Sequence, residues 1–181
     1  MLAGSREDAN TRTGTKPVHK FPFKVMVWCG LTYQGATKVI VLPPKTSFDS
    51  NFYIKNVLPI VEKEGPRLIG NDFVFQQDGA TCHKSGESIT YIKNSGMKFI
   101  SPRHWPANSP DLNVLDYFFW NEVSSRLTVK KFTARDDLIK KIKETVKEIP
   151  LKMIQDAINQ FRSRVYAVQI NQGGLILNKY F

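Results

Sequence analysis

The hydrophobic positions of this chain form short apolar runs in its first half and helical stripes in its second half. Two runs, at 25–31 and 38–42, flank a short turn that contains glycine, which is typical of an antiparallel pair of strands. Two prolines follow and end the pair, because proline cannot donate to a strand ladder. Further apolar runs predict strands at 73–77 and 98–100. We therefore expect a small sheet built mostly from the first half of the chain.

A helix is expected between this hairpin and the third strand, over residues 49–64. Pro59 lies inside it and predicts a kink or two short helices, because proline lacks the backbone donor that a helix interior needs. Gly65 and Pro66 are expected to close it. The apolar residues near helical spacing are Phe52, Val57, Ile60 and Val61.

Four more helices are predicted, at 84–95, 113–127, 134–149 and from Pro150 onward. The last two carry apolar stripes that we interpret as core packing. The stripe of the third consists of Leu138, Ile142, Val146 and Ile149, and that of the fourth of Ile154, Ala157, Ile158, Phe161, Val165 and Val168. Strands that alternate with helices in this order indicate the α/β class.

The composition fits one globular domain with a substantial core. The chain has 181 residues, of which 41% are hydrophobic and 12% aromatic. Residues 1–20 are polar and aperiodic and are expected to form a tail, as are 175–181, which leaves residues 21–174 as the domain. No apolar run approaches the length of a membrane span, so we expect no membrane partner. Two cysteines, Cys29 and Cys82, are too few for a disulfide-stapled scaffold and predict buried thiols in an intracellular protein.

The charge predicts an anionic partner. The net charge is +10, of which +3 falls in residues 1–24, +1 in residues 25–120 and +6 in residues 121–181. A basic excess that flanks a nearly neutral centre is compatible with DNA approaching from outside. The candidate DNA-binding residues are Lys130, Lys131, Lys140, Lys141, Lys143 and Lys147. A solvated helix face without a partner remains the alternative.

Two aspartates are the candidates for chemistry. Asp78 follows the strand at 73–77, and Asp116 lies where a turn leads into a helix. Carboxylates held on rigid elements can bind divalent metals for phosphoryl chemistry. The competing interpretations are a helix N-cap for Asp78 and an ordinary exposed helix position for Asp116. Asp111 follows Ser109 and Pro110 and is expected to form an Asx-turn or a helix cap.

Three motifs together resemble the catalytic domain of mariner-type transposases, in the Tc/mariner branch of the DDE/D recombinases. They are QQDGATCH at 76–83, WPANSPDLN at 105–113 and LDYFFW at 115–120. The 37 residues between Asp78 and Asp116 are similar to the spacing in the mariner-like group whose third acid is aspartate. His83, within the first motif, is expected at a helix start, or else in contact with a phosphate or a metal ligand.

The resemblance implies a ribonuclease-H-like mixed sheet flanked by helices, with extra helices at the C-terminal end. It also implies DNA transposition and integration through metal-dependent phosphodiester cleavage, with Mg²⁺ or Mn²⁺ as cofactor and no small-molecule cofactor. Asp78 and Asp116 would be the catalytic metal ligands, and a DNA substrate implies a nuclear location. The family's first catalytic aspartate lies on a first, central strand upstream of residue 25, and both are expected to be absent here.

That absence predicts a chain that binds DNA largely independently of sequence and cleaves it weakly or not at all. An open sheet edge also invites pairing with another chain, so a homo-oligomer is expected. Two other functions remain open at this point. One is a non-catalytic interaction module that pairs through the open edge, and the other is a metal-dependent phosphohydrolase, for which the chain offers no glycine-rich phosphate loop.

Overall fold

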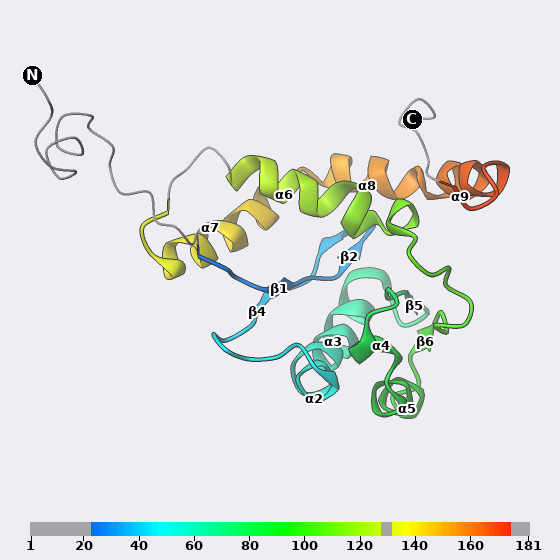
Figure 1. Cartoon of the computed structure of the whole chain (residues 1–181), viewed down its shortest axis with the longest axis horizontal. Coiled ribbons are helices and arrows are strands. Elements are labelled where there is room, and N and C mark those ends of the chain that lie inside the picture. Colours follow the sequence, from blue (N-terminus) through cyan, green and yellow to red (C-terminus); the bar gives the residue numbers. More distant parts are fainter. Residues whose placement is uncertain (1–22, 128–131, 175–181) are drawn as a thin grey trace, which may run out of the picture.

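The computed structural model describes residues 23–127 and 132–174 (Figure 1). The expected tails at 1–20 and 175–181 lie outside the described residues, as do Lys130 and Lys131. Within the described ranges the chain forms three short strand pairs and a set of helices, in the α/β order expected from the sequence. No described helix has the length and apolar character needed to cross a membrane.

The expected hairpin is present, divided into two short ladders. Strand β1 (Val27–Trp28) pairs antiparallel with β4 (Ile40–Val41), and β2 (Leu31–Thr32) pairs with β3 (Gly35–Ala36). The register shifts by one residue between the ladders, as in a β-bulge. At the shift Gly30 N donates to the Thr37 hydroxyl at 2.8 Å, so a side chain replaces a backbone acceptor.

A parallel strand pair forms the second part of the sheet. Strands β5 (Val74–Phe75) and β6 (Lys98–Phe99) are joined by a crossover that contains α4 (Thr81–Lys84) and α5 (Gly86–Asn94). A parallel pair needs such a crossover, because a tight turn cannot connect its strands. The single helix predicted at 84–95 is therefore two helices, divided at Ser85, whose hydroxyl accepts the Ser88 N–H and caps α5.

The helix predicted over 49–64 is continuous from α2 (Ser50–Phe52) through a π-helical turn (Tyr53–Val57) into α3 (Leu58–Ile69). Asp49 begins it, because its carboxylate accepts the Phe52 N–H at 2.8 Å. The irregularity expected around Pro59 takes the form of the π turn, which places this proline in the first turn of α3, where a missing N–H costs little.

The prediction that Gly65 and Pro66 close this helix is wrong. Helix α3 runs through both residues to Ile69 and ends at Gly70, whose φ of 85° suits glycine. Gly65 serves close packing, since a Cβ built there would lie 2.6 Å from the Phe73 ring. The residue that resembled a helix stop in the sequence is thus a contact point between α3 and the segment that leads into β5.

The C-terminal half is helical. Two irregular turns, a 3₁₀ helix (Pro110–Leu112) and a π helix (Leu115–Phe119), lead into α6 (Trp120–Leu127). Helix α7 (Arg135–Glu148) matches its prediction, and Ile142, Val146 and Ile149 of its apolar stripe are buried.

The single helix expected from Pro150 is wrong beyond residue 159. The chain forms α8 (Leu151–Asn159) and then α9 (Phe161–Ile170), which begins a new direction at Gln160. Ile154 and Ala157 of the predicted stripe are buried, whereas Phe161 and Val165 are 38% and 40% exposed. The break rotates the second half of the stripe out of the core, which periodicity alone does not reveal.

The hairpin lies between α6, α7 and α8 on one side and α2 and α3 on the other (Figure 1). An apolar cluster lies on each side of it. Because successive strand residues point to opposite faces, Val27 and Cys29 pack with α6, α7 and α8, while Trp28 packs with α3 and α5. No described strand lies between β1 and β5. Instead, an apolar cavity of about 360 Å³ is lined by residues of β1, β2 and β5, among them Trp28, Leu31 and Phe75.

Candidate functional site

Asp78 lies in the turn between β5 and α4. Its Oδ1 accepts the Ala80 N–H at 3.0 Å, which makes an Asx-turn. The competing interpretation of Asp78 as a helix N-cap is not observed, because α4 begins at Thr81 and no side chain caps it. The Asp78 side chain is 49% exposed. Its Oδ1 is held by the turn.

A hydrogen bond with His83 orients the Asp78 carboxylate. The Nδ1 of His83 lies 2.6 Å from Asp78 Oδ1, and its ring is buried beside the ring of Tyr53, at 4.5 Å between centroids. Gln77 connects these residues, because it accepts from the Tyr53 hydroxyl at 2.6 Å and donates to the His83 carbonyl at 3.2 Å. Both roles left open for His83 are observed, because it lies in the first turn of α4 and contacts a candidate metal ligand. Tyr53 carried no signal in the sequence that distinguished it from an ordinary core residue, and Gln77 lies in the first motif without being singled out there.

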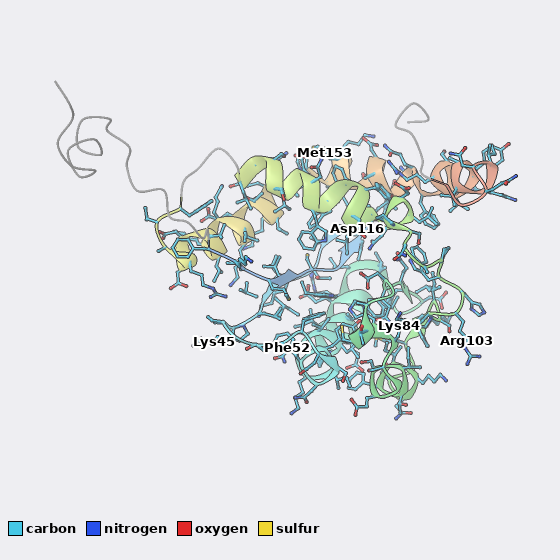
Figure 2. All side chains as sticks on the ribbon, viewed as in Figure 1. Lys45, Phe52, Lys84, Arg103, Asp116 and Met153 are labelled. Carbon is cyan, nitrogen blue, oxygen red and sulfur yellow. The ribbon has the colours of Figure 1, made fainter. Side chains whose placement is uncertain are left out.

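Asp116 lies in the π-helical turn before α6 (Figure 2). Its Oδ2 accepts from the side-chain amide of Asn113 at 2.9 Å, and the carbonyl oxygen of that amide accepts the Leu115 N–H at 3.2 Å. Asn113 is buried, so it holds the carboxylate from the protein side. π-helical turns in otherwise regular helices are frequent at functional sites, which agrees with this placement of Asp116.

The two carboxylates share an electrostatic environment. The hydrogen bond from His83 is the largest influence on Asp78 and lowers the pKa of its carboxyl group. Partial removal from water is the largest influence on Asp116 and raises its pKa, and the negative charge of Asp78 raises it further. A divalent cation near both groups would relieve this repulsion.

Asp111 is placed as a structural residue. It lies in the first turn of the 3₁₀ helix that precedes Asn113, and its carbonyl accepts from Arg164 of α9 at 3.4 Å. The guanidinium of Arg164 also stacks 3.8 Å over the ring of Tyr117, whose hydroxyl donates to the Ala157 carbonyl at 2.7 Å. These contacts fix the segment that carries Asp116 against α8 and α9.

The candidate DNA-binding lysines that are described lie on α7, at the left of Figure 1, away from β5 and α4. Lys141 forms ion pairs with Glu144 and Glu148. Lys140, Lys143 and Lys147 are exposed. The described candidate lysines thus lie on one helix, and that helix does not adjoin Asp78.

In the described part of the chain no three His, Cys, Asp or Glu side chains are close enough together to hold a metal ion. In this part of the chain the candidate ligands for a cation are thus limited to the carboxylate oxygens of Asp78 and Asp116. The hydrogen bonds described above involve Oδ1 of Asp78 and Oδ2 of Asp116, which leaves the other oxygen of each carboxylate open to a hard cation such as Mg²⁺ or Mn²⁺.

Comparison with curated proteins finds transposases of nematode transposable elements. The chain is 30% identical to the Tc3 transposase of Caenorhabditis elegans over 156 residues, 84% of this chain and 45% of that protein. It is 27% identical to the Tcb1 transposase of Caenorhabditis briggsae over 100 residues, 55% of this chain and 35% of that protein. The chain thus spans between a third and a half of these relatives. No protein-family model matches it.

Comparison with solved structures also finds transposases. The catalytic domain of Mos1 mariner transposase matches with a TM-score of 0.75 at 15% identity, covering 84% of this chain and 76% of that one. A Mos1 paired-end complex with the left transposon end matches with a TM-score of 0.77 at 16% identity, covering 90% of this chain and 48% of that one. These similarities establish a shared fold.

Proposed function

This chain contains a domain of the Tc/mariner transposase type, and from that premise we propose that it is a transposon-derived DNA-binding domain whose ancestral chemistry is metal-dependent phosphodiester cleavage and strand transfer. The observation that supports this most strongly is the pair Asp78 and Asp116. Each is held by a hydrogen bond from one neighbouring side chain, and each keeps a carboxylate oxygen outside the hydrogen bonds described above. A nuclear location follows from a DNA substrate and belongs to the same proposal.

The proposed cofactor is Mg²⁺ or Mn²⁺. Mos1 catalytic domain structures include one with Mg and one with Mn, and the hard oxygen ligands of Asp78 and Asp116 fit the same ions here. The bound cation would act as a Lewis acid on a phosphodiester. His83 would keep Asp78 ionised and fixed in direction, and Asn113 would do so for the direction of Asp116.

Two carboxylates bind one divalent ion more readily than they bind two divalent ions. The described residues contain no third acid beside them, and a two-metal site needs further ligands to balance its charge. We therefore propose that this chain binds DNA and cleaves it weakly or not at all. Binding rests on charge, since the net charge is +10, and is largely independent of sequence.

The position of a further strand in the sheet is also a proposal. We infer that the cavity between β1 and β5 is the place of one further strand of a ribonuclease-H-like sheet. Three observations support this. Each sheet has two described strands, the cavity lining is mostly apolar, and the flanking residues Met26 and Val74 are 56% and 55% exposed. The same open edges favour a second function, an interaction module that accepts a strand from another polypeptide or from a second copy.

A filter-binding salt titration with a parallel nicking assay in Mn²⁺ tests the proposed function. We expect binding to a random-sequence duplex that weakens steeply with salt, and little nicking. Asp78→Asn should leave the salt dependence nearly unchanged, because the proposed role of this residue is to bind the cation and not to neutralise phosphate charge. Salt-insensitive binding, or no binding at low salt, would contradict the DNA-binding claim. Strong nicking that is lost in Asp78→Asn would contradict the claim of weak cleavage.

A further inference from the structure

A second concave surface, the basic groove, lies where β3, α3 and the end of α7 meet. It has a volume of about 790 Å³ and is distinct from the region of Asp78 and Asp116, neither of which lines it. Its floor contains the buried side chains of Val39, Val146 and Ile154, so its shape is set by the apolar core beneath it.

Basic side chains outnumber acidic ones in the basic groove. Four basic side chains and two acidic ones line it. Both acids already have partners, because Glu64 accepts from the Lys38 backbone N–H at 3.0 Å and from Arg67 at 3.4 Å, while Glu148 pairs with Lys141, two turns earlier on α7. The negative charge in the groove is therefore largely compensated by contacts that already exist.

The ammonium groups of Lys38, Lys143 and Lys147 are not compensated in this way. They are exposed, and within residues 23–127 and 132–174 they form no ion pair or side-chain hydrogen bond. Lys143 and Lys147 are one helical turn apart, about 6 Å along the axis of α7, and so project on the same side. Lys38 reaches the groove from the hairpin, so the three cations come from two elements fixed on one core.

These features fit a linear polyanion. Successive phosphates of one DNA strand are about 3.4 Å apart along the helix axis, so the separation of the lysine pair on α7 corresponds to about two phosphate steps. Lys140, one turn before Lys143 and also exposed, extends the row of cations beyond the groove. A compact anion would use only part of this row.

We propose that the basic groove binds the phosphodiester backbone of DNA through Lys38, Lys143 and Lys147, apart from the site at Asp78 and Asp116. The inference rests on the proposed function, because it assigns a surface to the DNA binding proposed above. It also assigns different roles to the candidate lysines of α7. Lys143 and Lys147 contact phosphate in the groove, whereas Lys141 neutralises Glu144 and Glu148.

The test compares two triple variants of the full chain with equal loss of charge. The groove variant is Lys38→Gln, Lys143→Gln, Lys147→Gln, and the control is Lys45→Gln, Lys55→Gln, Lys93→Gln, three exposed lysines that do not line the groove. Glutamine keeps most of each side-chain stem. Circular dichroism and unfolding curves check that both variants fold.

The probe is a fluorescently labelled random-sequence duplex, and the readout is the slope of log K against log salt concentration. We expect the groove variant to lose up to about 0.9 of slope for each phosphate contact removed, and the control to lose far less. Equal losses in the two variants would overturn the groove while leaving DNA binding intact. Failure of the unmodified chain to bind the duplex at low salt would contradict both the groove and the proposed function.

Lysine acetylation read by mass spectrometry gives an independent readout on the unmodified chain. Bound DNA should protect Lys38, Lys143 and Lys147 from acetylation, whereas Lys55 and Lys93 should react equally with and without DNA. Protection of all exposed lysines alike, or protection that excludes the groove, would overturn the assignment of this surface.

Discussion

At the scale of single residues, the contact between Asp78 and His83 determines how the candidate site responds to acid. The pKa of Asp78 is lowered in the folded chain, mainly by the hydrogen bond from His83. Its ionised form therefore contributes stability that is present above its unfolded pKa, near 3.9, and is lost as the pH falls through the lower folded value. The Asp78 side chain is half exposed, so this contribution is reduced by solvent screening.

Removing the carboxylate should remove this pH dependence. Asp78→Asn is expected to lower the free energy of unfolding at pH 7 by about 1 kcal/mol, the typical value of one hydrogen bond to a charged group when it is partly exposed. Below the folded pKa the difference from the unmodified chain should shrink. Urea unfolding of both proteins at neutral and acidic pH measures it. A difference that is constant with pH would show that the carboxylate is not stabilised by its partner.

Asp78 and Asp116 became the candidate site residues mainly because they lie in motifs that resemble those of a known family. The sequence did not locate Gln77 and Tyr53, because a buried hydrogen bond between side chains 24 residues apart has no local signature. The N-cap interpretation of Asp78 did not hold because the Asx-turn to Ala80 satisfies the carboxylate before α4 begins.

At the scale of elements, Gly65 shows how a packing requirement can resemble a helix stop. A side chain at this position would lie against the Phe73 ring, with a Cβ at 2.6 Å. Gly65→Ala should therefore lower the free energy of unfolding by about 1–3 kcal/mol through overpacking, despite the better helix propensity of alanine.

Gly86→Ala is the matched control for this prediction. Gly86 begins α5, and a Cβ there would have no neighbour within 4 Å. The control substitution should leave stability unchanged or raise it slightly. Urea unfolding of the two variants separates the effects, and equal stabilities would mean that Phe73 yields to the added methyl group.

Periodicity predicted the elements well where one face of a long helix is buried, as in α7 with Ile142 and Val146. It did not predict the break between α8 and α9, because the residues after Gln160 continue the same apolar spacing in a new direction. The strands of the hairpin were located but are shorter than predicted, since the bulge at Thr37 divides the hairpin.

At the scale of the whole molecule, the open edges of β1 and β5 should influence solution behaviour. Backbone groups on these edges have no described strand to pair with, and apolar side chains such as Met26 and Val74 are exposed beside them. We expect the purified chain to self-associate, with a weight-average mass that rises with concentration in sedimentation velocity experiments.

A charge on the edge should oppose this association. Val74→Lys places an ammonium group at an exposed position of β5, a feature that blocks strand pairing in natural sheets. Ile170→Lys, at an apolar position on α9 that is 55% exposed and does not line the cavity, is the control. The β5 variant should remain monomeric at concentrations where the control associates. A concentration-independent monomer for the unmodified chain would contradict the open-edge account.

The central claim is that Asp78 and Asp116 form one divalent cation site, and isothermal titration calorimetry with Mn²⁺ at neutral pH tests it most directly. We predict binding of Mn²⁺ to the unmodified chain, at least about tenfold weaker binding for both Asp78→Asn and Asp116→Asn, and no change for Asp136→Asn on α7. Because both carboxylates bind the same ion, the double variant should be little weaker than either single variant. Independent, additive losses, or Mn²⁺ binding that survives in both single variants, would contradict a shared site.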